Sequence, residues 1–262
     1  MRQIVFLGTG NGMPIASSCS SLLIKNEKTN ILIDVGGGHD ILVQFHRANI
    51  DPTTVDNIFI SHYDSDHILG IVPLVRAFHR WGEPKMRKIF CSAIVKEAIE
   101  SLFTFVAKKH YHEVKPYLEF VIVNDGDTFS INGWEISFFD LQSNKTHQLG
   151  CSIIFEDQKK LSFLGDEPLK EHCLDRLQGT DILIHEAFCL DDAKDTFKPH
   201  EKNHGTVKEA AMNATKIGAK QLVFYHMEDN TLANRKVEYL TEAKEYFHGE
   251  VFVPVDLDTF EF

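Results

Sequence analysis

Apolar residues recur along the chain at two spacings, and these spacings predict where strands and helices form. Short runs rich in β-branched and aromatic residues, separated by turn residues, predict strands. They occupy residues 3–7, 21–24, 30–34, 57–60, 88–91, 119–123, 135–139, 152–155, 161–164, 182–184, 222–225 and 251–254. Apolar positions at helical spacing predict helices at residues 40–48, 70–78, 94–106, 170–177, 206–217 and 232–247.

The order of these elements indicates an α/β protein with mixed β-sheets. Strands alternate with helices along the chain, and the turn signals "NDGD" and "SINGWE" separate strands that resemble hairpins. No linker, repeat or low-complexity segment interrupts the pattern. We therefore expect residues 1–262 to form a single domain, a four-layer αββα sandwich of two mixed β-sheets.

The composition is that of an ordinary soluble protein, with 43% hydrophobic and 25% charged residues. No apolar stretch approaches the roughly 18 residues that span a bilayer. The start "MRQIVFLGTG" leads directly into a strand, so no membrane association and a cytoplasmic location are expected. The cysteines, at positions 19, 91, 151, 173 and 189, have neither CxxC spacing nor an even count, which predicts reduced thiols.

Charge and glycine spacing narrow the range of ligands. A net charge of −11 argues against a broad basic surface for long nucleic acid, although the segment "KPHEKNH" could meet a phosphate. The glycines of "FLGTGNGMP" do not complete a dinucleotide fingerprint, because Met13 stands in place of its third glycine. Small anionic or neutral molecules therefore remain possible substrates.

The segment "SHYDSDH" carries the first candidate chemistry. It places His62, Asp64, Asp66 and His67 in the loop between an expected strand and the helix that begins near Gly70. Carboxylates at this spacing repel one another unless a cation, most simply a metal ion, compensates them. The alternative interpretation is a solvated acidic turn.

Three further candidate ligands lie next to expected strands. His147 precedes the strand at 152–155, Asp166 follows "LSFLG", and His226 follows "LVFY". Loops at strand ends commonly gather catalytic groups in α/β proteins. Each residue alone is more often a surface turn residue, and only the ordered set makes a metal site the better interpretation.

This ordered set resembles the metallo-β-lactamase superfamily, and within it the ribonuclease Z-like branch, which carries HxHxDH followed by a distant His, an Asp and a final His. The segments "FLGTGNGMP", "SSLLI", "ILIDVGGG", "IFISHYDSDHILGI", "FLGD", "LIHEAF", "HGTVKEAA" and "LVFYH" all follow in family order. The resemblance covers nearly the whole chain. It implies the αββα fold and a hydrolase with a dinuclear metal centre.

By this resemblance, two divalent ions would be held by two ligand sets that share Asp166 as a bridge. The first set is His62, Asp64, His147 and Asp166, and the second is Asp66, His67, Asp166 and His226. Such a pair of ions activates water and polarises a phosphoryl or carbonyl oxygen. Asp66 would also orient or deprotonate the water. The resemblance further implies that Glu186 of "HEAF" and His204 of "HGT" bind phosphate and protonate the leaving group.

Asp64 departs from the family pattern, which usually has histidine at this place. Its carboxylate lowers the formal charge of a site with two dications from +2 to +1 and favours manganese or iron beside zinc. As an alternative, Asp64 does not ligate and the first site is weakly occupied.

A second departure concerns the substrate. Only 18 residues separate His147 from Asp166, and the tRNA-gripping arm of true ribonuclease Z enzymes does not fit there. With the acidic charge, this favours a phosphodiesterase acting on a small molecule or short nucleotide. The alternatives are a lactonase or arylsulfatase-like hydrolase, a diiron oxidoreductase with a separate flavoprotein partner, a ribonuclease Z-type tRNA 3′ endonuclease, and a non-catalytic sensor.

Two remaining segments are secondary candidates. Residues 95–114 are expected to form one solvated amphipathic helix, with a lid or a homodimer surface as alternatives, and their His110 and His112 form only a weak metal signal. Residues 188–204 are expected to form a mobile loop. Within it, His200 is a second candidate site residue, and Phe188 or Phe197 could stack on an aromatic group of the substrate.

Overall fold

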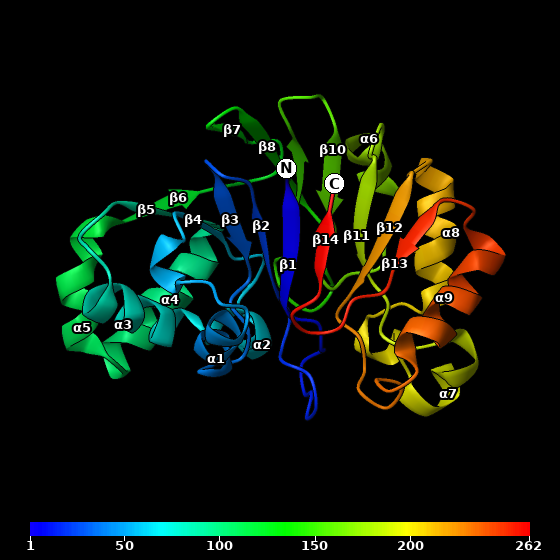
Figure 1. Cartoon of the computed structure of the whole chain (residues 1–262), viewed down its shortest axis with the longest axis horizontal. Helices are drawn as coiled ribbons and strands as arrows, with labels where there is room; N and C mark the ends of the chain where they lie inside the picture. Colours follow the sequence, from blue (N-terminus) through cyan, green and yellow to red (C-terminus); the bar gives the residue numbers. More distant parts are fainter. The chain divides into compact units, whose positions relative to one another are not determined.

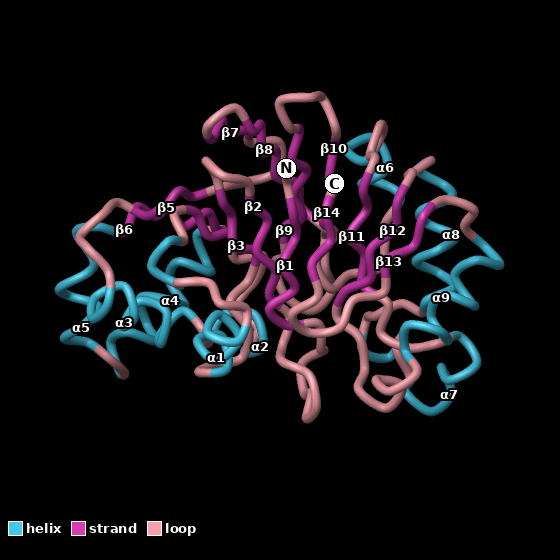
Figure 2. The backbone as a smooth tube through the Cα atoms, viewed as in Figure 1, coloured by secondary structure: helices cyan, strands magenta, loops and turns pink.

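The computed structural model describes residues 1–262 and divides the chain into two compact units. The first comprises residues 1–123 and 255–262, and the second comprises residues 124–254. Each unit contains a seven-stranded mixed sheet (Figures 1 and 2). The expected α/β class with two mixed β-sheets is thus confirmed, and the single domain stays a prediction.

The sheet of the first unit has the order β14-β1-β2-β3-β4-β5-β6. Its strands are β1 (Gln3–Gly8), β2 (Ser21–Lys25), β3 (Asn30–Ile33), β4 (Asn57–Phe59), β5 (Arg87–Cys91), β6 (Leu118–Ile122) and β14 (Thr259–Glu261). The strands β3 to β6 are parallel, whereas β14, β1, β2 and β3 pair antiparallel. Parallel strands place their carboxyl ends at one edge, so the loops after β3 and β4 lie side by side.

Helices cover one face of this first sheet (Figure 1). They are α1 (Asp40–Arg47), α2 (Ser65–Ile68), α3 (Ile71–Trp81), α4 (Ala93–Phe105) and α5 (Lys108–Val114). Phe45, Leu74 and Ile99 from these helices share a buried core with Leu32 and Ile58 of the strands. Each such side chain contributes about 1.5–3 kcal/mol on burial, so this core holds the strand ends in place.

The sheet of the second unit has the order β13-β12-β11-β10-β9-β8-β7. Its strands are β7 (Thr128–Ile131), β8 (Trp134–Asp140), β9 (Leu149–Ile154), β10 (Lys160–Phe163), β11 (Ile182–Glu186), β12 (Gln221–Tyr225) and β13 (Glu250–Phe252). The strands β7 to β10 pair antiparallel, whereas β10 to β13 are parallel. The carboxyl ends of β10, β11 and β12 therefore meet at one edge.

The helices of the second unit are α6 (Leu174–Leu177), α7 (Lys194–Phe197), α8 (Val207–Ile217) and α9 (Arg235–Tyr246). The α8 helix begins at a capping box, in which Thr206 and Glu209 satisfy each other's backbone N–H groups, and ends at Gly218 with φ 71°. Its small residues Ala210 and Ala214 share a buried core with β12 and α9. This packing fixes the start of α8 beside the end of β11.

Several expected elements differ from the structure. The helix expected over residues 95–114 is broken, because Ala107 adopts the left-handed conformation with φ 54° between α4 and α5. The helix expected at 170–177 shortens to a 3₁₀ turn and the four residues of α6. The strands β7 and β14 and the one-turn helix α2 were not expected. All five cysteines are free thiols, as expected, and no helix is long and apolar enough to cross a membrane.

Candidate metal centre

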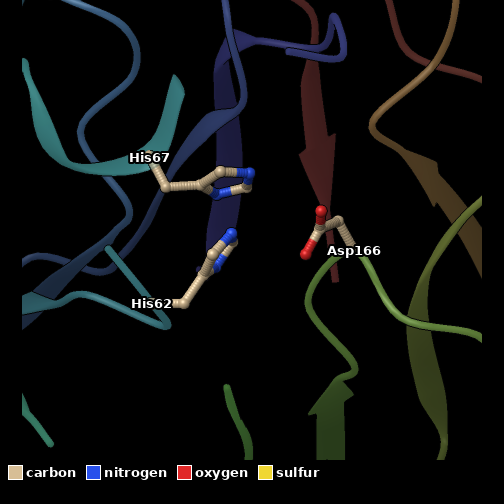
Figure 3. A group of neighbouring side chains, drawn as sticks. All are labelled: His62, His67 and Asp166. Carbon is tan, nitrogen blue, oxygen red and sulfur yellow. The ribbon is translucent and has the colours of Figure 1, made fainter. Parts of the chain in front are cut away.

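The first group of candidate ligands lies after β4 in the first unit. His62 follows this strand in a segment without regular structure, whereas Asp66 and His67 lie on α2, which corrects the expectation that the whole cluster forms a loop. Both histidines are fully buried, and their rings lie 4.1 Å apart between centroids with a 45° tilt (Figure 3). Asp66 is 9% exposed, and its Oδ2 lies 3.2 Å from Nε2 of His67. The structure thus gathers His62, Asp66 and His67.

Asp64 belongs to the same group but is more open to solvent. It occupies the N-cap position of α2, its side chain is 41% exposed, and its Oδ2 lies 3.7 Å from Nε2 of His62. An oxygen at this place can approach an ion beside His62, although less water is excluded from it than from Asp66.

Asp34 orients His67 and was not identified from the sequence. It follows β3, and its Oδ2 lies 2.8 Å from Nδ1 of His67. It also accepts hydrogen bonds from the backbone N and the hydroxyl of Ser61. A carboxylate on Nδ1 leaves Nε2 of a histidine as the metal-binding nitrogen. The signal that could have revealed it is the acidic residue at the end of a buried strand in "ILIDVGGG".

Replacing Asp34 with asparagine should weaken metal binding. Asparagine tolerates the φ of 54° at this position, so the backbone should remain in place. The substitution removes only the negative charge that Asp34 places beside Nδ1 of His67. Outer partners of a metal-binding histidine contribute roughly 10- to 100-fold in affinity. Titration with Mn²⁺ or Zn²⁺ measures the change, and Asp56→Asn is the control, because Asp56 pairs with Lys85 and should leave affinity unchanged. Equal affinities in all three proteins would contradict the role of Asp34.

The second group of candidate ligands lies at the carboxyl ends of β10, β11 and β12 in the second unit. Asp166 follows β10 (Figure 3), and His226 follows β12 with φ 56°. Both are nearly fully buried, and Nε2 of His226 lies 3.8 Å from Oδ2 of Asp166. One ligand atom of each of Asp166, His204 and His226 lies within 4.8 Å of the others. These three side chains from distant parts of the sequence therefore form one cluster.

Glu186 and His204 form a buried pair beside this cluster. Oε2 of Glu186 lies 2.7 Å from Nδ1 of His204, and Oε1 accepts a hydrogen bond of 2.7 Å from the backbone N of Gly205. Burial raises the pKa of Glu186 to about 7, and His204 opposes this rise. Burial alone would lower the pKa of His204, but Glu186 and then Asp166 raise it. Phe188 stacks on the His204 ring at 4.9 Å between centroids and so fixes its plane.

Two neighbours of Asp166 were missed in the sequence analysis. Lys145 places Nζ 3.1 Å from Oδ2 of Asp166, and the side-chain amide of Gln148 donates to Oδ1. Burial alone would lower the pKa of Lys145, but Asp166, and then Glu186 and Glu167, raise it. Lysine is not a usual metal ligand, so only the folded structure could have drawn attention to it.

His147 is exposed in the second unit, unlike Asp166, and its place in the expected first ligand set stays a prediction. Its side chain is exposed, whereas Thr146 and Gln148 on either side are buried. Leu141 donates its backbone N–H to the carbonyl of Gln148 and so extends the β8–β9 pairing. Alternate residues of an extended segment point to opposite sides, so with Gln148 facing Asp166, His147 faces solvent.

The secondary candidates are not part of these groups. Residues 188–204, expected to form a mobile loop, contain α7 and two 3₁₀ turns. His200 is exposed and lies 2.9 Å from Oε1 of Glu209. Phe188 stacks on His204, and Phe197 packs edge-on against Phe188, so both rings make contacts within the protein.

The donor sets fit a divalent cation. Each unit presents buried imidazoles beside buried carboxylates, the groups that bind zinc, manganese and iron in proteins. Burial alone would lower the pKa of His67, but Asp66 and Asp34 raise it well above its ordinary value, so positive charge is favoured around this ring. A cation at such a place compensates carboxylates that would otherwise repel one another.

Comparisons with known proteins agree with this chemistry. Residues 29–227 match the model of the beta-lactamase superfamily domain. A ribonuclease Z of Nanoarchaeum equitans is 26% identical over 99% of this chain and 93% of its own length. One of Bacillus cereus is 26% identical over 98% of both chains.

Solved structures share the fold over the whole chain. The metallo-beta-lactamase fold protein YhfI from Bacillus subtilis superposes with a TM-score of 0.80 at 19% identity, covering 100% of this chain and 99% of that one. The short form of human tRNase Z gives 0.77 at 20% identity, covering 99% and 98%. Because residues 29–227 match its domain model, the chain belongs to the beta-lactamase superfamily, in its metallo-β-lactamase fold, and the relatives most similar in sequence that are given above bear the name ribonuclease Z.

Proposed function

We propose that this protein is a metal-dependent phosphodiesterase acting on a small molecule or a short nucleotide. The buried Glu186–His204 pair beside Asp166 and His226 carries the proposal. A carboxylate-supported imidazole suits protonation of a leaving oxygen, a step that phosphodiester cleavage needs.

The metal would be held by the histidine and carboxylate ligands that the family resemblance assigns in each of the two units. They are His62, Asp64, Asp66 and His67 of the first unit with Asp166 and His226 of the second. A bound divalent ion lowers the pKa of water and polarises a phosphoryl oxygen. Asp66 would orient or deprotonate the attacking water. Zinc, manganese and iron all suit this mixture of imidazole and carboxylate ligands.

His204 would act on the leaving group. Its Nδ1 faces Glu186 and its ring is held by Phe188, which leaves Nε2 to donate a proton. Glu186 compensates the imidazolium charge and holds the ring in one orientation. Neither residue needs to bind metal for this role.

The size of the substrate is inferred from the region between β9 and β10. β9 ends at Ile154 and β10 begins at Lys160, so a short turn joins these paired strands. The alignment with the ribonuclease Z of Halorubrum lacusprofundi runs over 309 positions, more than the 262 residues of this chain, so that relative carries segments absent here. With the net charge of −11, these features favour a substrate smaller than tRNA.

A ribonuclease Z-type tRNA 3′ endonuclease is the second candidate function. The curated relatives bear the name ribonuclease Z and align with nearly the full chain. This agreement supports cleavage of RNA phosphodiesters more directly than cleavage of a small molecule.

A substrate panel with metal-loaded protein tests the proposal. The panel comprises a dinucleotide, bis-p-nitrophenyl phosphate, a tRNA precursor with a 3′ trailer, a lactone and an aryl sulfate. We expect hydrolysis of the first two and at most weak cleavage of the tRNA precursor. Efficient 3′ cleavage of the precursor would establish the second candidate. Hydrolysis of only the lactone or sulfate would contradict phosphodiester chemistry.

Asp64 should tune the choice of metal. With an oxygen at this place, Mn²⁺ or Fe²⁺ should support activity at least as well as Zn²⁺, whereas Asp64→His should shift the preference toward zinc. Activity and affinity measured for each metal with both proteins check this. Identical metal profiles would mean that Asp64 does not contact the ion.

A further inference from the structure

A second cluster of possible metal ligands lies on the surface of the first unit, where α5 packs against α3 (Figure 1). It comprises His79 on α3 with His110 and Glu113 on α5. One ligand atom of each residue lies within 4.8 Å of those of the other two. We call this cluster the α3–α5 site, and none of its residues belongs to the ligand sets expected for the candidate metal centre.

Helix periodicity and packing bring these three side chains together. His110 and Glu113 are three positions apart in the sequence, so they lie on one face of α5. Tyr111 and Val114 of α5 share a buried core with residues of α3. This core holds α5 in place beside His79, which lies in the last turn of α3. All three ligands therefore lie within one unit and on two helices that contact each other.

His112 is not part of the site, although the sequence suggested a pair of His110 with His112. Residues two positions apart on a helix do not face each other. His112 is exposed, and it lines a different cavity together with Glu100 and Lys115. The structure thus gives His110 other partners than the sequence spacing indicated.

The distances in the α3–α5 site suit a tetrahedral zinc ion. Bonds of about 2.0–2.1 Å place the ligand atoms of such an ion about 3.3 Å apart. Nε2 of His79 lies 3.0 Å from Oε2 of Glu113. The rings of His79 and His110 lie 5.2 Å apart between centroids, with a tilt of 50°. The side chains of His79 and Glu113 are 32% and 39% exposed, so small rotations bring all three ligand atoms to the required separation.

His110 distinguishes this cluster from a simple surface ion pair. A contact between His79 and Glu113 alone would account for those two residues and would assign nothing to His110. Nδ1 of His110 is buried and has no hydrogen-bond partner in the protein, whereas most buried polar atoms have one. A neutral imidazole that is not committed to other groups is a common ligand of transition metals. The third residue of the cluster is therefore suited to bind an ion.

The α3–α5 site opens into a cavity of about 390 Å³. Arg76, Arg80 and Lys109 also line this cavity, and all three are exposed. Salt screens charges on an exposed surface, and the carboxylate of Glu113 offsets part of their repulsion of a dication. The cavity leaves a fourth coordination position for water or for a small anion, which the three cations attract.

We propose that the α3–α5 site binds one zinc ion through His79, His110 and Glu113, separately from the candidate metal centre. Two imidazoles and one carboxylate form a known ligand set of zinc sites that keep one position open. The ion would join α5 to α3, because each helix contributes at least one ligand. This inference does not depend on the proposed phosphodiesterase function.

Anomalous diffraction at the zinc edge tests the site directly. Crystals of the wild type, His110→Ala and Glu113→Gln are soaked in the same zinc solution. We expect a peak in the wild type at about 2.0–2.2 Å from ligand atoms of His79, His110 and Glu113. The peak should be absent from both variants, while zinc at the candidate metal centre should stay.

Zinc titration in solution gives a second readout. The wild type should bind one more zinc ion per chain than His110→Ala. Because each of the three residues is expected to bind the ion directly, the affinity of this site should fall by more than the ~10- to 100-fold that an outer partner contributes. His112→Ala is the matched control, since it removes an exposed histidine from the same helix, and it should bind zinc like the wild type. Circular dichroism checks that all variants fold.

Each outcome decides between distinct statements. Equal zinc stoichiometry and affinity in the wild type, His110→Ala and Glu113→Gln would overturn the assignment. A peak that appears only in soaked crystals, without a difference in solution, would also overturn it. Hydrolysis of phosphodiesters should be unchanged in both variants. Loss of hydrolysis in every protein, with zinc still bound at the α3–α5 site, would contradict the proposed function and leave this site in place.

Discussion

Replacing His204 with alanine should lower kcat by roughly 10²- to 10⁴-fold on a phosphodiester with a poor leaving group, the usual contribution of general-acid catalysis. His204 is 8% exposed, and its Nδ1 lies 2.7 Å from Glu186, so the ring is held ready to donate from Nε2. The loss should shrink for p-nitrophenyl esters, because that leaving group needs little protonation. Steady-state kinetics on the two substrates measure the difference, and metal content should stay unchanged.

His200→Ala is the matched control for this variant. His200 lies in the same segment of chain, but it is exposed and pairs with Glu209, so its loss should leave kcat nearly unchanged. Glu186→Gln keeps the shape of the side chain and removes its negative charge. This variant should retain part of the wild-type dependence of kcat on the leaving group. Equal losses on good and poor leaving groups would reassign His204 to phosphate binding.

Replacing Asp166 with alanine should remove more metal than any other single change at the centre. Its carboxylate is 3% exposed and clusters with His204 and His226. Because Asp166 is expected to bind the metal directly, it should contribute more than the ~10- to 100-fold of an outer partner. Elemental analysis after reconstitution measures the loss, with His62→Ala as the comparison.

His62→Ala should retain more metal than Asp166→Ala. His62 belongs to only one of the two expected ligand sets, whereas Asp166 belongs to both, so the loss of His62 should cost less bound metal. If His62→Ala lost all metal while Asp166→Ala kept it, the ligand assignment would be wrong. At most a trace of metal in the reconstituted wild type would contradict a metal centre altogether.

The sequence by itself determined most of the strands and the order of the candidate ligands. Runs such as residues 57–60 and 222–225 are almost entirely apolar, which is typical of strands that are buried on both faces. This local pattern therefore predicts the strands directly. Candidate ligands that lie just after such strands, His62 and His226 among them, are positioned by the strand ends, so the local pattern predicts where they lie. The pairing of Glu186 with His204 was implied by the family resemblance, and the two side chains lie 2.7 Å apart.

Weak local signals left other elements undetermined. The break at Ala107 carries neither glycine nor proline, and its φ of 54° shows that packing of α4 and α5 overrides local preference. The strand β14 has only three residues and exists through pairing with β1, more than 200 residues away in the sequence. Neither the break at Ala107 nor the pairing of β14 with β1 produces a periodic pattern in the sequence from which it could be predicted.

Only the tertiary structure decided which side chains near the ligands face Asp166. The segment at 145–148 contains a lysine, a histidine and a glutamine, and composition alone favours the histidine as a ligand. The pairing of β8 with β9 sets the register of this segment, so Gln148 faces Asp166 and His147 faces solvent. A shift of one residue in register would exchange the two faces. Lys145 and Asp34 depend on the same kind of long-range placement, because their partners Asp166 and His67 lie 21 and 33 residues away.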